Sequence, residues 1–253
     1  MSQQDYENKL AAIQAVSDAD VATPNIPISV AVQEAENLYY WCQTDKDKLV
    51  AAGLRWELVD DLPARAAACR YAQSVWNKDH QSVEEAQKEW KEKSPAAFDL
   101  RDELLHHFFF AYRNAPDVYS KVNTIAEGNG NADMIQDLSD LTILGKQYPD
   151  PLNSISLDMA LLDEASSTSD EMATLLARVN GGQKTQDQTK ILRDKAFTHL
   201  KDAVDEIRHT GQYVFWRDDD RKKGYISPYF RQRNKANAKK QSTTESQQTA
   251  PTK

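Results

Sequence analysis

The chain has 253 residues, of which 40 % are hydrophobic and 28 % charged, and its formal net charge is -8. It is long enough to bury one large or two small hydrophobic cores, and no apolar run approaches the length of a membrane span. The start, MSQQDYENKL, lacks the features of a secretory signal, and Cys42 and Cys69 are too few for a disulfide framework. We therefore expect a cytoplasmic protein with reduced core thiols and no membrane association.

The charge is distributed unevenly along the chain. Residues 221–253 contain nine Lys or Arg and one acid, a net of +8, whereas residues 1–220 contain 22 bases and 38 acids, a net of -16. The few Gly and Pro residues and the many Ala, Leu, Glu, Lys and Gln residues favour helices. A mean hydropathy of -0.72 favours an elongated bundle whose helices face water on one side.

The first half of the chain predicts an N-terminal arm followed by two amphipathic helices. Residues 1–27 form a partly helical arm, because Pro24 and Pro27 interrupt any longer helix. A helix is expected from Ile28 to about Ala52, with Gly53 ending it. Asp60-Asp61-Leu62-Pro63 begins the next helix, which is expected to run to about Lys93. Its seam alternates spacings of four and three, in a heptad-like pattern: Leu62, Ala66, Cys69, Gln73, Trp76, His80, Val83, Gln87 and Trp90.

The most apolar run, LLHHFFFAY, lies within residues 95–113, where Ser94-Pro95 is expected to start a new helix. Apolar groups on nearly all sides predict a buried central helix against which the others pack. A further helical stretch follows after Pro116, to about Glu127. The connection at 128–131 has the sequence GNGN and is predicted to be the most flexible internal point, where possible halves 28–127 and 132–224 meet.

The second half predicts helices at 132–146, 154–180 and about 185–217, the last two separated by Gly181-Gly182. Short connections favour antiparallel neighbours. The predicted fold class is therefore all-α: an elongated antiparallel helical bundle of about six main helices over residues 28–224. Residues 225–253 are predicted to form a basic and then low-complexity, disordered C-terminal tail.

The best candidate binding region is the stretch 213–233, in which aromatic and basic side chains alternate. Its members are Tyr213, Phe215, Trp216, Arg217, Arg221, Lys222, Lys223, Tyr225, Tyr229, Phe230, Arg231 and Arg233. This composition is typical of single-stranded nucleic-acid binding, in which cations contact phosphates and rings stack on bases. Asp218-Asp219-Asp220 argues against that interpretation. Alternatively, the stretch binds an acidic protein surface, or its rings close the end of the bundle.

A second candidate is Glu103 and His107, four residues apart, which we expect to form a partly buried polar pair. Such a pair suits proton transfer or half of a metal site, although a structural hydrogen bond explains it equally simply. Two Glu-x-x-His motifs, Glu103–His106 and Glu206–His209, resemble di-iron ligands that Glu34 and Glu164 could complete. However, the helical periodicity turns Glu206 and His209 away from the apolar face. We therefore expect no metal, no cofactor and no catalytic residues.

The segments DLSDLTILGKQYPDPL (137–152) and GQYVFWRDDDRKKGY (211–225), followed by SPYFRQR, resemble a group of uncharacterised all-α bacterial proteins. The resemblance spans about residues 28–233 and implies no function. The sequence as a whole predicts a non-enzymatic helical scaffold or protein-interaction module that self-associates or binds a protein partner. One alternative is a nucleic-acid-associated protein that uses residues 213–233. Another is a metal-dependent enzyme centred on Glu103 and His107.

Overall fold

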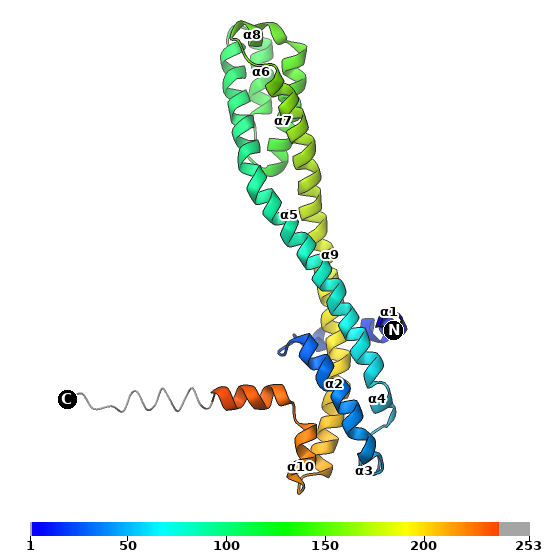
Figure 1. The fold of residues 1–253 in the computed structure, drawn as a ribbon. Coiled ribbons are helices and arrows are strands. Elements are labelled where there is room, and N and C mark those ends of the chain that lie inside the picture. Colours follow the sequence, from blue (N-terminus) through cyan, green and yellow to red (C-terminus); the bar gives the residue numbers. More distant parts are fainter. Residues whose placement is uncertain (1, 238–253) are drawn as a thin grey trace, which may run out of the picture. The chain divides into compact units, whose positions relative to one another are not determined.

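The computed structural model describes residues 2–237, which form helices and no strand, so the all-α prediction is confirmed (Figure 1). The chain divides into two compact units: unit 1 comprises Met1–Lys78 and Asp187–Lys253, and unit 2 comprises Asp79–Gln186. Each unit encloses its own cluster of buried hydrophobic side chains. Among the described residues, no helix is long and apolar enough to cross a membrane.

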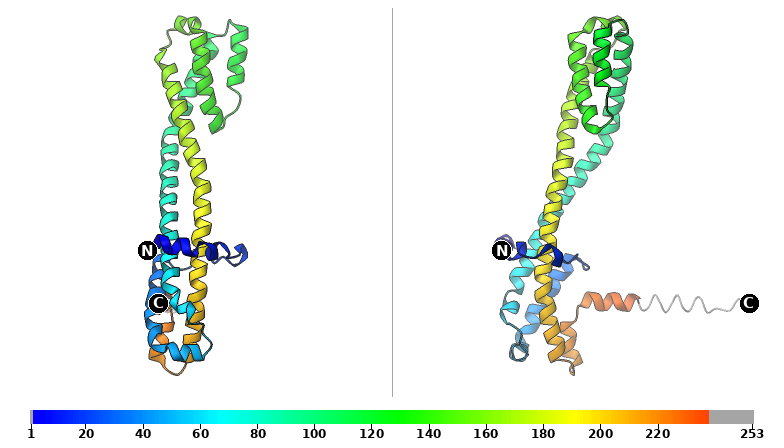
Figure 2. Two further views of the ribbon diagram at one scale, coloured as in Figure 1. Left: turned by 90° about the vertical axis from the view of Figure 1, so that its right-hand side faces the viewer. Right: turned by 180° about the vertical axis from the view of Figure 1, so that it is seen from behind.

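Unit 1 is built from both ends of the chain. Its elements are α1 (Ser2–Gln14), η1 (Asp18–Asp20), α2 (Ile28–Cys42), η2 (Gln43–Asp45), α3 (Lys46–Ala51), α4 (Glu57–Asp60), the first part of α5 (Leu62–Ala111), the last part of α9 (Ala160–Val214), α10 (Asp219–Lys222), η3 (Lys223–Tyr225) and a helix over 228–237. Helix α1 lies across α5 and α9, whereas α2 runs alongside them (Figure 2).

Unit 2 contains the rest of α5, α6 (Pro116–Ile125), α7 (Asn131–Gln147), α8 (Pro149–Ser154) and the first part of α9. Segments of α5, α6, α7 and α9 lie side by side in all views (Figures 1 and 2). A buried ion pair joins two of them: Arg101 Nε on α5 donates to Asp137 Oδ2 on α7 at 2.6 Å. Arg101 also donates to the carbonyl of Gly128, in the connection between α6 and α7. The structure therefore places the predicted meeting point of the two halves inside unit 2.

Several helix ends follow the sequence signals. Gly53 ends α3 with a φ of +97°, where Gly53 N donates to Val50 O and Leu54 N donates to Leu49 O. This pair of hydrogen bonds is the Schellman pattern, which favours glycine because of its left-handed conformation. The predicted helix over 28–52 is interrupted by η2, whose residue Asp45 has a structural role described below. Helix α5 begins at Leu62, as the Asp-Asp-Leu-Pro signal predicts.

The predicted restart at Ser94-Pro95 is wrong, because α5 continues through Pro95 without a break. A proline inside a helix removes one backbone hydrogen bond and costs about 3 kcal/mol. Ala86 on one side of Pro95 and Ala97 and Leu100 on the other are buried in the same core. Packing of these side chains along one helix outweighs the local cost of the proline.

The predicted break at Gly181-Gly182 is also wrong, because α9 passes through both residues. Gly182 has a packing reason to be glycine, since a Cβ atom there would lie 2.9 Å from Val83 Cγ2. The two helices thus approach closely where the second one lacks a side chain. The absence of a Cβ atom at Gly182 stabilises the close packing of the two helices by more than the low helix propensity of glycine destabilises α9.

The heptad-like seam of α5 is buried at some of its positions in each unit, whereas others are half-buried and Gln87 is exposed. Leu62, Ala66 and Cys69 are buried in unit 1, and Val83 is buried in unit 2. Cys69 and Cys42 are free and buried, in agreement with the prediction of core thiols. Burial raises the pKa of each thiol to about 12, so both remain protonated at neutral pH.

The first part of the predicted C-terminal tail is helical. Residues 225–237 are helical apart from a short link at 226–227, and Tyr225 is fully buried. Specific contacts with α2 and α9, described below, order this segment. The low-complexity part that the sequence predicts to be disordered lies outside the described residues.

Candidate binding surface

The structure separates the aromatic residues of the candidate stretch into an anchoring set and an exposed set. Phe215 and Tyr225 are buried and stack on each other, with ring centroids 5.6 Å apart. Tyr229 and Phe230 are half-buried against the same core. Tyr213 and Trp216 are 73 % and 60 % exposed. Only part of the predicted surface is therefore accessible to a partner.

Asp45 in η2 is the main anchor of the buried set. Its Oδ2 accepts hydrogen bonds from the hydroxyl of Tyr225 and from Arg221 Nε, each at 2.6 Å. The Arg221 guanidinium also donates to the carbonyl of Trp41 and lies 4.1 Å from the centroid of its ring. Burial raises the pKa of the Tyr225 hydroxyl, and its donation to Asp45 raises it further. The hydroxyl therefore stays protonated and acts as a donor.

Two glycines allow this segment to pack closely. A Cβ atom at Gly211 would lie 2.0 Å from Tyr225 Cδ1, and one at Gly224 would lie 2.0 Å from Trp41 Cε2. Such distances are far below van der Waals contact, so any side chain at either position would displace a packed aromatic ring. The sequence between Gly211 and Tyr225 is therefore constrained by packing as well as by hydrogen bonds.

The acidic run Asp218-Asp219-Asp220 is partly neutralised within the segment itself. Asp218 caps α10, since its Oδ1 accepts a hydrogen bond from Arg221 N at 2.9 Å. Asp220 accepts from Lys223 Nζ at 2.7 Å, and this hydrogen bond lowers the pKa of the Asp220 carboxyl. These contacts give two of the three acids local structural roles.

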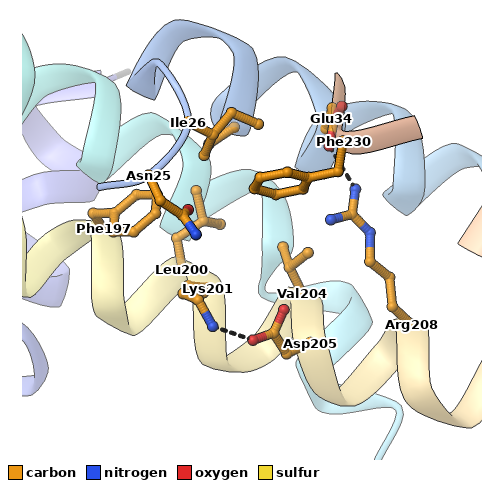
Figure 3. Close-up of a pocket in the computed structure, with 11 residues that line it drawn as sticks. Asn25, Ile26, Glu34, Phe197, Leu200, Lys201, Val204, Asp205, Arg208 and Phe230 are labelled. Carbon is orange, nitrogen blue, oxygen red and sulfur yellow. Dashed lines mark hydrogen bonds and ion pairs between the residues drawn. The ribbon is translucent and has the colours of Figure 1, made fainter. Parts of the chain in front are cut away.

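A second anchor lies between α2 and α9 (Figure 3). Glu34 is buried on α2; its Oε2 accepts from Arg208 Nη2 at 2.8 Å, and its Oε1 accepts from Tyr229 N at 2.9 Å. The ring of Phe230 projects between Ile26 and Val204. The C-terminal segment is thus held on unit 1 by the Asp45 and Glu34 carboxylates.

The accessible residues of the stretch 213–233 are mainly basic residues, together with the aromatic residues Tyr213 and Trp216. Tyr213 and Trp216 lie within one turn of each other at the end of α9, and the Arg217 guanidinium is 4.1 Å from the centroid of Trp216. Arg231 and Arg233 are exposed on the helix 228–237. The remaining accessible bases are Lys222 and Lys223, of which Lys223 contacts Asp220.

The second candidate, Glu103 and His107, is not buried. His107 Nε2 and Glu103 Oε1 are 3.9 Å apart, and the side chains are 34 % and 55 % exposed. The predicted burial of this segment on nearly all sides is wrong, because Phe110 is exposed while Leu104 and Phe108 face the core. Counting apolar residues around the helix overestimated its burial, since aromatic side chains also occur on solvated faces. The pair is a contact between side chains four residues apart, in which His107 is half-buried and Glu103 is exposed.

The di-iron pattern finds no support in the structure. Glu206 and His209 are exposed, as the helical periodicity predicts, and Glu34 is paired with Arg208. Within residues 2–237, no three His, Cys, Asp or Glu side chains form a group that could hold a metal ion. Iron coordination by the Glu-x-x-His motifs would require these helices to present ligands to a common point.

Sequence reasoning missed Asp45, Glu34 and Asp137 as structural centres, because each forms its contacts with residues far away in the chain. The available signal was weak: Glu34 and Asp45 stand near the apolar face of their predicted helix. No family model matches this chain, and no curated protein or solved structure matches it.

Proposed function

We propose that this protein is a non-enzymatic helical interaction module that binds a protein partner through Tyr213, Trp216 and Arg217. These three residues are called the exposed aromatic surface. The observation that carries the proposal is the exposure of Tyr213 and Trp216 on an otherwise anchored segment. Trp, Tyr and Arg are the residue types that most often dominate the binding energy of protein interfaces.

The anchors beneath this surface support the proposal. In the sequence, Phe215 lies between Tyr213 and Trp216. Its ring stacks on that of Tyr225, whose hydroxyl donates a hydrogen bond to Asp45. A surface that is already ordered before binding loses less conformational entropy when a partner docks. Two exposed rings on a tightly packed support therefore suit an interface better than two rings on a free tail would.

The charges around the surface favour an acidic partner. Arg217 lies over Trp216, and Lys48 Nζ is 5.4 Å from the ring of Phe215 on the same part of unit 1. The Asp220 carboxylate is paired with Lys223, so it neutralises Arg217 and Lys48 less. Complementary charge accelerates association and selects between partners. Self-association and a cytoplasmic location, which suits the two free thiols, belong to the same proposal.

Paired variants test the proposal. Tyr213→Ala with Trp216→Ala removes the exposed rings, whereas Tyr40→Ala removes a ring that is equally exposed on α2. We expect the double variant to weaken binding to a partner at least about 30-fold, since the loss of even one interface anchor costs about 2 kcal/mol. The Tyr40 variant should bind as the natural chain does. Equal binding by all three chains would contradict the proposal.

A second candidate function is single-stranded nucleic-acid binding. It is favoured by the helix 228–237, whose exposed Arg231, Arg233 and Lys235 have no acidic neighbour within that helix. The Arg233 guanidinium also lies 4.9 Å from the centroid of Phe230, an arrangement of ring and cation that suits stacking on bases.

Fluorescence anisotropy with labelled single-stranded RNA and DNA, over a salt series, tests this candidate. The comparison variant replaces Arg231, Arg233 and Lys235 with Ser, because deleting residues from 221 onward would also remove the buried Tyr225. Nucleic-acid binding predicts affinity that falls steeply with salt and a shallower salt dependence in the variant. No binding by the natural chain excludes this function.

A further inference from the structure

The sequence contains two Asn-Gly dipeptides, and the structure places them in different backbone settings. Asn129-Gly130 lies in the connection between α6 and α7, where residues 127–130 belong to no helix. Asn180-Gly181 lies inside α9. All four residues are exposed to solvent. The two dipeptides therefore differ in backbone conformation and not in access to water.

An asparagine that precedes a glycine reacts with its own backbone when the geometry allows it. The glycine nitrogen, after losing its proton to hydroxide, attacks the side-chain carbon Cγ of the asparagine. The amide nitrogen takes a proton from water and leaves as ammonia, and a five-membered succinimide ring remains. Water then opens the ring at either carbonyl group, which gives aspartate or isoaspartate. Glycine favours the attack because it places no side chain beside the attacking nitrogen.

The helix protects Asn180 from this reaction. Closing the ring requires rotation about the Cα–C bond of the asparagine, away from the helical ψ of about -42°. Each backbone N–H inside an α-helix also donates to the carbonyl four residues earlier, so the nitrogen of Gly181 is held in the helix. Because α9 continues on both sides of this dipeptide, reaction at Asn180 requires that the helix first open locally.

No helix restrains Asn129, but one carboxylate acts on the attacking nitrogen. Gly130 is the N-cap residue of α7, and its N–H donates to Asp133 Oδ2 at 2.8 Å. This hydrogen bond holds the proton on the nitrogen, and the negative charge of the carboxylate disfavours loss of that proton. The bond is exposed and joins residues three apart, so it opens more readily than the hydrogen bonds within α9. It therefore slows the reaction without preventing it.

We propose that Asn129 is a site of spontaneous deamidation in the folded chain, and that the hydrogen bond from Gly130 to Asp133 governs its rate. The dipeptide lies between two fixed points, because the carbonyl of Gly128 accepts a hydrogen bond from the buried Arg101. Isoaspartate inserts a methylene group into the backbone between these points, which puts both hydrogen bonds under strain. The site lies in unit 2, whereas the exposed aromatic surface lies in unit 1.

Peptide mapping by mass spectrometry of the full-length chain, incubated at mildly alkaline pH and sampled over time, measures the reaction at both dipeptides. Replacement of the amide NH2 by OH increases the mass of the peptide. The same chain unfolded in guanidinium chloride is the reference, because both dipeptides then have the same backbone freedom. Asp133→Ala removes the capping carboxylate, and Asp140→Ala, which removes an acid elsewhere on α7, is the matched control. Circular dichroism checks that each variant is folded.

The proposal predicts similar rates at Asn129 and Asn180 in the unfolded chain. In the folded chain, the rate at Asn129 should be at least about 10-fold higher than that at Asn180. Asp133→Ala should increase the rate at Asn129 at least about 3-fold, and Asp140→Ala should leave it unchanged. A folded chain in which Asn129 reacts no faster than Asn180 overturns the proposal. An unchanged rate in folded Asp133→Ala also overturns it, since the capping hydrogen bond would then not govern the reaction.

Discussion

The hydroxyl of Tyr225 donates a hydrogen bond of 2.6 Å to Asp45 Oδ2, joining residues that are 180 positions apart in the sequence. Arg221 Nε donates to the same oxygen. Both donors belong to the stretch whose composition predicts a binding region. The structure therefore uses part of that stretch to fasten the C-terminal segment and leaves Tyr213 and Trp216 exposed.

Tyr225→Phe and Asp45→Ala should destabilise unit 1 to different extents. The first removes one hydrogen bond while Arg221 still satisfies Asp45, so we expect a loss of about 1 kcal/mol in the free energy of unfolding. The second leaves the buried Tyr225 hydroxyl and the half-buried Arg221 without their shared acceptor, and we expect a loss of about 3 kcal/mol. Urea unfolding followed by circular dichroism measures both. Equal losses would show that Asp45 is not the shared acceptor.

Alanine substitutions at two glycines of α9 should have opposite effects. At Gly181 no atom lies within 4 Å of an added Cβ, so alanine should raise stability by about 0.5–1 kcal/mol through its better helix propensity. At Gly211 the Cβ would collide with the ring of Tyr225, so alanine should lower stability by about 2 kcal/mol or more. Thermal unfolding of both variants checks the signs, and a stable Gly211→Ala chain would contradict the observed packing.

The stability of unit 1 should depend on pH through His199. Burial, and then the positive charge of Arg65, lower the pKa of His199 to about 4, against about 6.5 in an unfolded chain. The unfolded chain therefore binds more protons between these values. The stabilising contribution is complete above pH 6.5 and is lost as the pH falls toward 4, by about 2 kcal/mol after allowance for solvent screening.

The groups facing His199 include Arg65 at Nδ1, with Asp61 and Lys9 also acting on its charge. Asp61 titrates lower: although burial opposes ionisation, hydrogen bonds from Lys9 and Arg65 lower the pKa of its carboxyl. His199→Gln should therefore flatten the stability profile between pH 4 and 6.5, as measured by urea unfolding at several pH values. The exposed His209→Gln serves as control, and an unchanged slope in His199→Gln would refute the assignment.

Removing one partner of the buried pair Arg101–Asp137 in unit 2 should destabilise the protein more than replacing both partners with apolar residues. Burial raises the pKa of the Asp137 carboxyl, and the hydrogen bond from Arg101 opposes that increase. Arg101→Met alone leaves a buried carboxylate without its partner and should cost about 3–5 kcal/mol. Combining it with Asp137→Leu should recover a large part of that loss. Chemical denaturation of the natural chain, the two single variants and the double variant measures this difference, and additive losses would contradict the coupling.

The sequence predicts most of the helical organisation correctly. Capping and helix-ending signals at Gly53, Leu62 and Pro116 coincide with observed boundaries, because these signals act through local backbone geometry. The same local rules failed at Pro95 and Gly182. There, packing along a continuous helix determined the result, and that packing involves residues distant in sequence.

The candidate site was predictable only in part. The alternation of rings and cations identified the right stretch, yet it gave no means to separate buried Phe215 from exposed Trp216. Their separation depends on Asp45 and on the close contacts of Gly211 with Tyr225 and of Gly224 with Trp41. The contacts of Asp45 and Gly224 join both ends of the chain. The division of the chain into two units also depends on such contacts, because each core takes one part of α5 and one part of α9, whereas the 128–131 connection stays within unit 2.

We propose that Tyr213 and Trp216 form a protein-binding surface on an anchored segment. The most direct measurement is quantitative affinity capture with the natural chain, the Tyr213→Ala/Trp216→Ala variant and the Tyr40→Ala control, followed by mass spectrometry. The account predicts a reproducible partner that the natural and control chains capture equally and that the double variant loses. Capture of that partner by the double variant at the natural level would contradict it.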